Sequence, residues 1–240
     1  TTLALPYNPT SLGVRAGGVD PGGPTVVGGE QVAALVCAHP DEIVFTSGGT
    51  EANNIAIRGA ARHLATRVAV TSCVEHPATA APLAHLREHH GWRVHELPVD
   101  GECRVRFDEL PTGAIGLGTL ILAHNETGAL QPVADLAERV HAAGGLVHAD
   151  AAQAVGKVPV DVADLGVDLL SIAGHKLYGP KGVGALFVRR GTRVAPVVVG
   201  AGQEGGLRRS AGQPAAEGVV EHSVDAVRVA GRPVRGHGGV

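Results

Sequence analysis

The chain has 240 residues, 44% of them hydrophobic, and a formal net charge of −3, which is typical of a globular protein with one sizeable α/β domain or two small ones. No basic run is longer than two residues, so the sequence argues against binding to nucleic acid or to an anionic membrane. It shows neither an apolar stretch long enough to cross a bilayer nor a signal-peptide pattern, so we expect a cytoplasmic protein.

The first predicted element is an irregular arm over residues 1–29, which are rich in glycine, proline and threonine. The chain contains no methionine, so we expect it to begin within a longer reading frame. A short helix is predicted over residues 31–38. The sequence "EIVFTS" then predicts a strand, and the Gly48-Gly49 turn leads into an amphipathic helix over "TEANNIAIRGAARHL".

From residue 67 onward, short apolar strands alternate with helices. The predicted strands are "RVAVTS", "WRVHELPV", "GTLILAHN", "LVHADAA", "DLLSIA" and "GALFVRR", and the main helices between them are "ATAAPLAHLREHH" and "VADLAERVHAAG". This alternation predicts an α/β fold with a mainly parallel sheet and helices on both faces. We assign this α/β domain to residues 30–200, followed over residues 201–240 by a Gly- and Arg-rich tail.

Polar residues follow the predicted strands at their carboxyl ends. Ligands of open parallel sheets bind at that edge. Five polar clusters are therefore expected to lie together there: Ser47–Thr50, Ser72–His76, His124–Glu126, His148–Gln153 and Gly174–Lys176.

The turn "TSGGTEANN" is one candidate binding element. Two glycines and Thr50 at a strand-to-helix turn offer free backbone amides and a hydroxyl, which can hold an anion. Taken alone, the plainer interpretation is a capped helix start, in which Thr50 and Glu51 support the first turn.

Several other side chains have both a chemical and a structural interpretation. Asp150, three residues before Gln153, can pair with a protonated heterocycle nitrogen or cap the next turn. His76 can stack on a flat ligand or move a proton, or it can simply begin a helix. His85 and His89 share a helix face without a third ligand, so we expect a solvated face and no metal site. The three cysteines form no CxxC motif, so neither a disulfide framework nor a zinc site is expected.

Lys176 follows a buried strand, where a charge must be paired, solvated or used. An amine that is partly desolvated beside other cations is suited to condense with an aldehyde. Lys181, in the loop that follows, is interpreted as an ordinary surface lysine. Together, four groups describe a site for pyridoxal 5′-phosphate (PLP). They are the anion-binding turn, the carboxylate of Asp150, the imidazole of His76 and the amine of Lys176.

The stretches that carry these residues, "DEIVFTSGGTEANNIAIRGAA", "SCVEHPA" and "LAHNETGALQPVADLAERVHAAGGLVHADAAQAVGKVPVDVADLGVDLLSIAGHKLYGPKGVGALFVRRG", resemble the class V aminotransferase superfamily, in its cysteine desulfurase and selenocysteine lyase branch. The resemblance runs from about Asn8 to about Arg209. It implies the large domain of a fold-type-I PLP-dependent transferase, normally a homodimer. By this resemblance, Lys176 would attach PLP covalently, and His76 would stack on its ring. Asp150 would pair with the ring nitrogen, and Gln153 would bond the phenolic oxygen. The phosphate would be bound by His175 and by Thr50, which shares a turn with Gly49, and Asn125 would line the site near the substrate.

The chain also departs from the family pattern. Ala173 stands where many desulfurases have a phosphate-binding serine, and Ser210-Ala211 stands where they have Gly-Thr. None of the three cysteines matches the position that accepts sulfur, which the resemblance places in a C-terminal domain beyond this chain. We therefore expect a PLP-binding domain that is truncated at both ends.

Three functions compete at this point. The first is cleavage of the C–S or C–Se bond of cysteine or selenocysteine, which gives alanine and transferable sulfur or selenium and implies a sulfur-acceptor protein as partner. The second is a PLP-binding module without turnover of its own. The third, a nucleotide-binding domain of another family, leaves Asp150, His76 and Lys176 unexplained, so the sequence favours the first.

Overall fold

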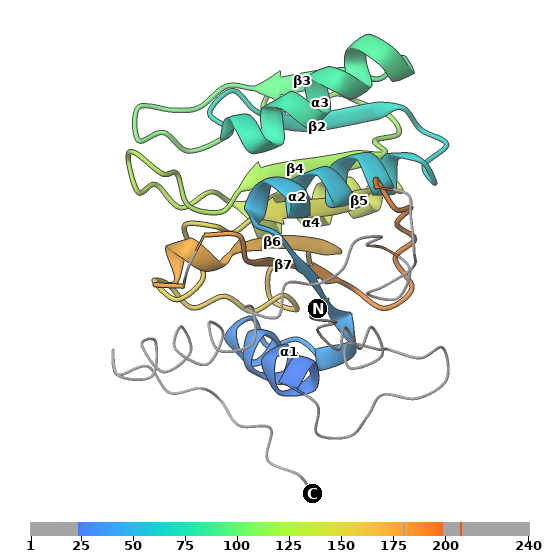
Figure 1. Cartoon of the computed structure of the whole chain (residues 1–240). Coiled ribbons are helices and arrows are strands. Elements are labelled where there is room, and N and C mark those ends of the chain that lie inside the picture. Colours follow the sequence, from blue (N-terminus) through green and yellow to red (C-terminus); the bar gives the residue numbers. More distant parts are fainter. Residues whose placement is uncertain (1–23, 180, 199–206, 208–240) are drawn as a thin grey trace, which may run out of the picture.

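Seven strands form one sheet in the order β1-β7-β6-β5-β4-β2-β3. The computed structural model of the chain describes residues 24–179, 181–198 and 207 (Figure 1). The expected arm up to residue 23 and the expected tail, apart from residue 207, lie outside the described residues. The strands are β1 (Ile43–Thr46), β2 (Val68–Ser72), β3 (Arg93–Leu97), β4 (Leu117–Ile121), β5 (Leu146–Asp150), β6 (Leu169–Ala173) and β7 (Gly184–Val188).

Four α-helices accompany the strands in the described part of the chain. They are α1 (Pro24–Leu35), α2 (Gly49–Asn54), which a π-helical turn (Ile55–Gly59) prolongs, α3 (Pro77–His90) and α4 (Val133–Ala142). Two short 3₁₀ turns, Pro40–Glu42 and Gly174–Lys176, precede β1 and follow β6.

The sheet is mainly parallel, as the alternation of strands and helices predicts. Strands β3, β2, β4, β5 and β6 pair in parallel, whereas β7 is antiparallel to both of its neighbours, β6 and β1. β1 therefore runs in the same direction as β6. Because of this shared direction, the carboxyl ends of every strand except β7 meet at one edge.

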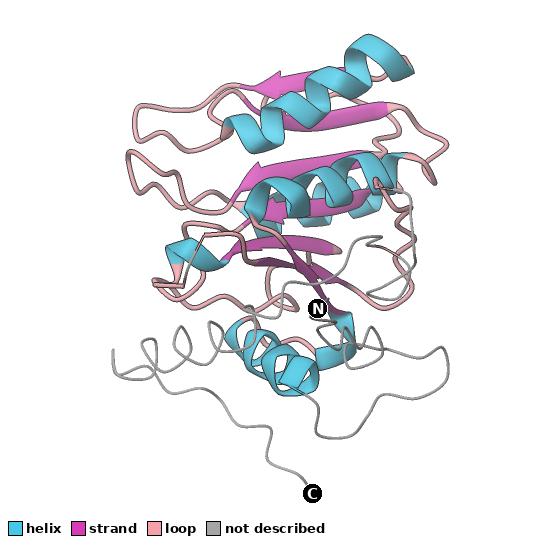
Figure 2. Ribbon diagram, in the orientation of Figure 1, coloured by secondary structure: helices cyan, strands magenta, loops and turns pink. Residues whose placement is uncertain are grey.

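Helices cover both faces of the sheet (Figure 2). Successive strand residues point to opposite faces, and the core clusters follow that alternation. In β1, Ile43 packs in the cluster that holds buried residues of α1 and α4, whereas Val44 packs in the cluster that holds α2. α3 packs with Ala69 and Leu117 on the α2 side. The buried polar side chains described below lie between the sheet and the helices α2 and α3.

The first helix differs from the sequence prediction. It begins at Pro24 and ends at Leu35, whereas an irregular arm was expected up to residue 29 and a helix over residues 31–38. Proline is tolerated in the first helical turn, because its missing N–H would have no partner there. Val32 and Ala33 are buried in the main core cluster, and this packing outweighs the low helix propensity of the two glycines that precede them.

Candidate functional site

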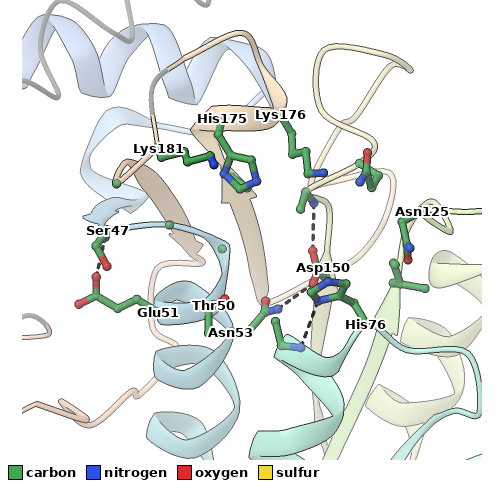
Figure 3. Close-up of a pocket in the computed structure, with 18 residues that line it drawn as sticks. Ser47, Thr50, Glu51, Asn53, His76, Asn125, Asp150, His175, Lys176 and Lys181 are labelled. Carbon is green, nitrogen blue, oxygen red and sulfur yellow. Dashed lines mark hydrogen bonds between the residues drawn. The ribbon is translucent and has the colours of Figure 1, made fainter.

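The carboxyl ends of the strands surround a pocket of about 430 Å³ (Figure 3). It lies at the edge that the parallel topology predicts, and each of the five polar clusters contributes to its lining. All eight predicted site residues line it: Gly49, Thr50, His76, Asn125, Asp150, Gln153, His175 and Lys176. The fold therefore brings together residues that are up to 127 positions apart, from Gly49 to Lys176.

Asp150, at the end of β5, is the buried acid of this pocket and is 3% exposed. Its Oδ2 accepts a hydrogen bond from Asn53 Nδ2 at 2.7 Å and another from Thr79 Oγ1 at 3.3 Å. Its Oδ1 accepts one from the backbone N of Ala152 at 3.0 Å. Asn53 on α2 and Thr79 on α3 are fully buried, so two helices and the following turn hold the carboxylate in one orientation toward the pocket. Sequence reasoning missed both helix residues.

His76 caps a helix and also lines the pocket. It is the N-cap of α3, where its Nδ1 accepts a hydrogen bond from the backbone N of Ala78 at 3.1 Å. Because Nδ1 is an acceptor, the proton of the neutral ring resides on Nε2. Figure 3 shows the ring beside Asp150. The two interpretations of this histidine, a helix-entry residue and a ring that faces a ligand, are therefore compatible.

The turn between β1 and α2 combines a helix start with open backbone amides. Gly48 has φ 149°, which a residue with a side chain rarely adopts. Glu51 Oε2 accepts a hydrogen bond from the backbone N of Ser47 at 2.5 Å, as the plainer interpretation of this motif requires. The amides of Gly49 and Thr50 lie in the first helical turn, where no intrahelical acceptor exists. Both residues line the pocket, so their amides can serve an anion.

Ala173, the last residue of β6, lies directly behind this turn. A Cβ on Gly49 would be 3.3 Å from Ala173 Cβ, and a Cβ on Gly184 would be 2.6 Å from Gly48 Cα. The turn therefore packs closely on β6 at Gly49 and on β7 at Gly48. The departure from the family pattern at Ala173 thus lies next to the turn whose amides would hold a phosphate.

Three cationic or potentially cationic side chains of the β6–β7 connection line the pocket. His175 and Lys176 come from the 3₁₀ turn that follows β6. Lys181 lines the same pocket, and Figure 3 shows it beside His175. Lys181 is exposed, as expected of a surface lysine, and it also lines the pocket, which the sequence did not predict. Gly174 N donates to Val183 O at 2.9 Å, which brings the two ends of the connection together beside the pocket.

Gln153 is oriented by a neighbour that sequence reasoning also missed. Its Oε1 accepts a hydrogen bond from Lys157 Nζ at 2.5 Å. With Oε1 engaged, the amide Nε2–H₂ is the group left to donate to an acceptor in the pocket. Burial, and the positive charge of Lys176, lower the pKa of Lys157. Lys157 thus lies close to the pocket, behind the residues that line it.

A second buried carboxyl, Glu75, lies next to this site. Its Oε1 accepts hydrogen bonds from Ser72 Oγ at 2.5 Å and from the backbone N of Ile121 at 3.0 Å. Its Oε2 is buried and has no hydrogen-bond partner among the described residues. Burial raises the pKa of Glu75 to about 8, and the charge of Asp150 acts in the same direction. Glu75 is therefore mostly protonated at neutral pH.

A buried row of polar side chains crosses the sheet beneath Asp150. His148 Nδ1 lies 2.7 Å from Thr119 Oγ1, and His148 Nε2 lies 2.9 Å from Ser171 Oγ. The three residues stand on adjacent strands and are fully buried. Burial lowers the pKa of His148 to about 4, so its imidazole is neutral and is not a proton carrier at neutral pH.

Other candidate residues lie elsewhere. His124 bonds within its own loop, where its Nδ1 accepts from the backbone N of Thr127 at 3.2 Å. The rings of His85 and His89 lie 4.8 Å apart, and the described residues contain no group of three or more His, Cys, Asp or Glu that could hold a metal ion.

None of the three cysteines forms a disulfide. Within the described part of the chain, no helix is long and apolar enough to span a bilayer.

Comparison with known proteins shows extensive similarity. A profile of the aminotransferase class-V family matches residues 29–213. The chain is 45% identical over 202 residues to a cysteine desulfurase of Gluconacetobacter diazotrophicus, covering 81% of the chain and 50% of the relative. It is 46% identical over 186 residues to the mitochondrial cysteine desulfurase of Drosophila melanogaster, covering 75% of the chain and 40% of the relative. The chain spans about half the length of the curated relatives it matches.

Solved structures agree with the fold. A NifS-like protein superposes with a TM-score of 0.78 at 34% identity, covering 86% of this chain and 58% of the other. A structure of SspA in complex with cysteine superposes with a TM-score of 0.79 at 33% identity, covering 84% and 60%. These matches confirm the α/β fold and its resemblance to PLP enzymes. With a family profile that matches most of its length, and with relatives at this identity, the chain belongs to the class-V aminotransferase family.

Proposed function

We propose that the chain is the PLP-binding part of a cysteine desulfurase, which releases alanine from cysteine and passes the sulfur atom to a thiol. The observation that carries this proposal is the convergence of Lys176, Asp150 and the open amides of the Gly49–Thr50 turn on one pocket. The relatives are cysteine desulfurases, and the family implies PLP as cofactor.

The residues present fit PLP by the chemistry of their donors. At one end of the pocket, the amides of Gly49 and Thr50 with His175 and Lys181 suit a phosphate. At the other end, the Asp150 carboxylate suits a protonated ring nitrogen. The volume of about 430 Å³ lies in the range of small-molecule pockets.

The remaining residues would fix the ring between these ends. His76 faces the pocket beside Asp150 and would stack on the ring (Figure 3). Gln153 Nε2 would donate to the phenolic oxygen, because Lys157 already occupies Gln153 Oε1. Asn125, an exposed residue of the lining, would contact the substrate side.

Lys176 would hold the cofactor covalently and later carry a proton. PLP, when bound, supplies an electron sink for the bonding pair of the substrate's α carbon. Lys176 Nζ would take the proton from that carbon as a general base. Lys176 is exposed in the pocket, so its amine can reach both cofactor and substrate.

The overall reaction balances without an oxidant. A thiol takes up the sulfur atom of cysteine and becomes a persulfide, while the carbon skeleton leaves as alanine. In the same way, selenocysteine would deliver its selenium atom. We place the PLP-binding domain at residues 30–200, with the thiol in a part of the protein outside this chain or on an acceptor protein, and we expect two copies to form a homodimer.

A second candidate is a PLP-binding module without turnover of its own. It is favoured by Ala173, at a position where a serine hydroxyl would add to the phosphate site.

Spectroscopy with matched lysine variants tests the proposal. PLP added to the purified chain should acquire the visible absorbance band that marks its attachment to a lysine. The Lys176→Ala variant should lack the band, whereas Lys181→Ala, which removes a neighbouring lysine, should keep it. A band that persists in Lys176→Ala would overturn the assignment of this residue.

Product analysis separates the two candidates. With cysteine or selenocysteine as substrate and a dithiol as acceptor, the first candidate predicts release of alanine with sulfide or selenide. A chain that shows the absorbance band but releases no alanine from either amino acid is the second candidate.

A further inference from the structure

A second pocket, of about 310 Å³, lies at the opposite edge of the sheet. It is built where the α2 helix ends, where β2 begins and where α3 ends (Figure 1). The first pocket lies at the carboxyl ends of the same strands, and the two share no lining residue. The second pocket is lined by Arg58, Ala61, Arg62, Leu64, Arg67, Leu86, His90, Trp92 and Val197.

Three arginines give this pocket a positive charge. Arg58 Nη1 donates to Asn54 Oδ1 at 3.3 Å, Arg62 Nη1 to Pro196 O at 3.3 Å, and Arg67 Nη1 to His90 O at 3.2 Å. Each of these bonds uses one of the five N–H donors of a guanidinium, so most donors remain for a ligand. The acceptors are neutral amide and carbonyl oxygens, which orient the guanidiniums without cancelling their charge.

No carboxylate compensates these charges within the described part of the chain. Arginines elsewhere on its surface do have acidic partners: Arg106 pairs with Asp108, and Arg190 pairs with Asp41. None of the ion pairs among the described residues includes Arg58, Arg62 or Arg67. In a chain with a net charge of −3, three uncompensated guanidiniums around one cavity form a distinct positive site.

Two histidines of α3 lie in or beside this pocket. His90, at the end of α3, lines the pocket, and His85 on the same helix packs against it with ring centroids 5.2 Å apart. The pKa of His85 is lowered, first by desolvation and then by the positive charges of Arg58, His89 and His90, whereas the charge of Glu88 raises it. Of the three arginines, Arg58 thus acts on a group just outside the pocket.

Apolar side chains form the floor between the charges. Leu86 and Trp92 are 3% and 4% exposed, and Ala61, Leu64 and Val197 are half-buried beside them. A water-poor floor strengthens electrostatic interactions at the rim, because fewer solvent dipoles screen them. The pocket thus combines an apolar floor with polar groups at its rim.

From these observations we propose that this pocket binds a small, multiply charged oxyanion of the phosphate class. Guanidinium forks match the oxygen geometry of phosphate and form two parallel hydrogen bonds with it. Three positive charges exceed what a single carboxylate needs, and they match a di- or trianion. The proposal does not rest on the proposed function, because the two pockets have separate linings.

Trp92 offers a direct readout. It is the only tryptophan of the chain and it lies in the floor of this pocket, so its fluorescence reports on this site alone. Inorganic pyrophosphate, inorganic phosphate and AMP are titrated in separate arms at constant ionic strength, with the chain free of PLP and saturated with it. We expect a saturable change in emission, at lower concentrations for pyrophosphate than for phosphate, whether or not PLP is present. A tighter response to AMP than to pyrophosphate identifies a nucleotide as the phosphate-bearing ligand.

Charge-matched variants localise the response. Arg58→Gln, Arg62→Gln and Arg67→Gln should each weaken pyrophosphate binding about tenfold, as expected for the loss of one charge-assisted contact. Arg106→Gln removes the same charge from an arginine that is paired with Asp108 and should bind as the wild type does. Unchanged emission of Trp92 without ligand shows that each variant keeps its fold around the pocket.

Three results would overturn the proposal. The first is the absence of a saturable response to any of the three anions. The second is an equal loss of binding in Arg106→Gln and in the pocket variants, which marks general surface charge rather than a site. A response to a poly-glutamate peptide without one to pyrophosphate also contradicts it, because this face would then serve an acidic polypeptide.

Discussion

Asn53 Nδ2 donates a 2.7 Å hydrogen bond to Asp150 Oδ2 across 97 residues of sequence. This bond connects the helix that follows β1 to the end of β5, inside the pocket where PLP is proposed to bind. Asn53 is fully buried, and Thr79 Oγ1 lies 3.2 Å from the same Nδ2. The orientation of the acid in the pocket is thus determined by two buried helix residues, of which Asn53 also lines the pocket.

Replacement of Asn53 by alanine should therefore affect both stability and cofactor binding. A hydrogen bond to a charged group contributes about 1.5–3 kcal/mol, and its loss leaves the Asp150 carboxylate short of a donor in a buried site. We expect the free energy of unfolding to fall by roughly this amount in urea titrations, and the affinity for PLP to fall as well. Asn54→Ala is the matched control, since Asn54 bonds only to neighbours on its own helix, Thr50 and Arg58. Equal effects of the two substitutions would contradict the role given to Asn53.

The buried carboxyl of Glu75 makes stability depend on pH. Its pKa is raised by burial from 4.5 to about 8, so between these values the folded chain holds a proton that the unfolded chain has released. Stability therefore falls as pH rises through this window, by roughly 1 kcal/mol per pH unit. Gln at this position keeps an oxygen for Ser72 Oγ and the backbone N of Ile121 and does not titrate.

The comparison of Glu75→Gln with the wild type isolates this effect. In urea titrations at pH 5, 6, 7 and 8, the variant should gain stability relative to the wild type as pH rises. Glu126→Gln, which removes a carboxyl from an exposed loop, controls for the change in charge. Parallel stability curves for Glu75→Gln and the wild type would show that Glu75 is already ionised in the folded chain.

His148 should produce the opposite slope. Burial lowers its pKa from 6.5 to about 4, so between these values the unfolded chain binds a proton that the folded chain does not. Stability therefore falls as pH decreases from 6.5 toward 4. An NMR titration of the His148 ring should show a neutral imidazole down to about pH 4, held between Thr119 and Ser171. Protonation of the ring near pH 6.5 would contradict the burial of His148 between Thr119 and Ser171.

The sequence was sufficient to predict the sheet and eight residues of the pocket lining. Apolar runs predict most of the strands, and polar residues follow several of them, so both the alternation and the shared edge could be read without coordinates. In β3 (RVHEL), apolar and polar residues alternate instead. The first helix was misplaced, because the burial of Val32 and Ala33 against the sheet decides where it forms, and such tertiary packing is not visible in local propensity.

Several residues that line or support the pocket could not be predicted in the same way. Asn53, Thr79 and Glu75 resemble ordinary polar residues near helix starts, and their partners lie 97, 71 and 46 residues away. Lys157 is only four residues from Gln153, yet nothing in that spacing distinguishes it from a surface pair. Lys181 is a surface residue, as expected, but its place in the pocket lining depends on the course of the β6–β7 connection, which is a tertiary feature.

Ala173 offers a substitution that should improve the site. Its Cβ would lie 3.3 Å from a Cβ on Gly49, so a hydroxyl on that carbon, in the variant Ala173→Ser, would reach the space beside the open amides of the turn. A hydrogen bond to an anionic phosphate should then raise the affinity for PLP about tenfold. In contrast, Gly49→Ala places a methyl group at this tight contact and should lower the affinity. Equilibrium dialysis of PLP measures both changes, and an Ala173→Ser variant that binds PLP no better than the wild type would place the phosphate away from the β6 end.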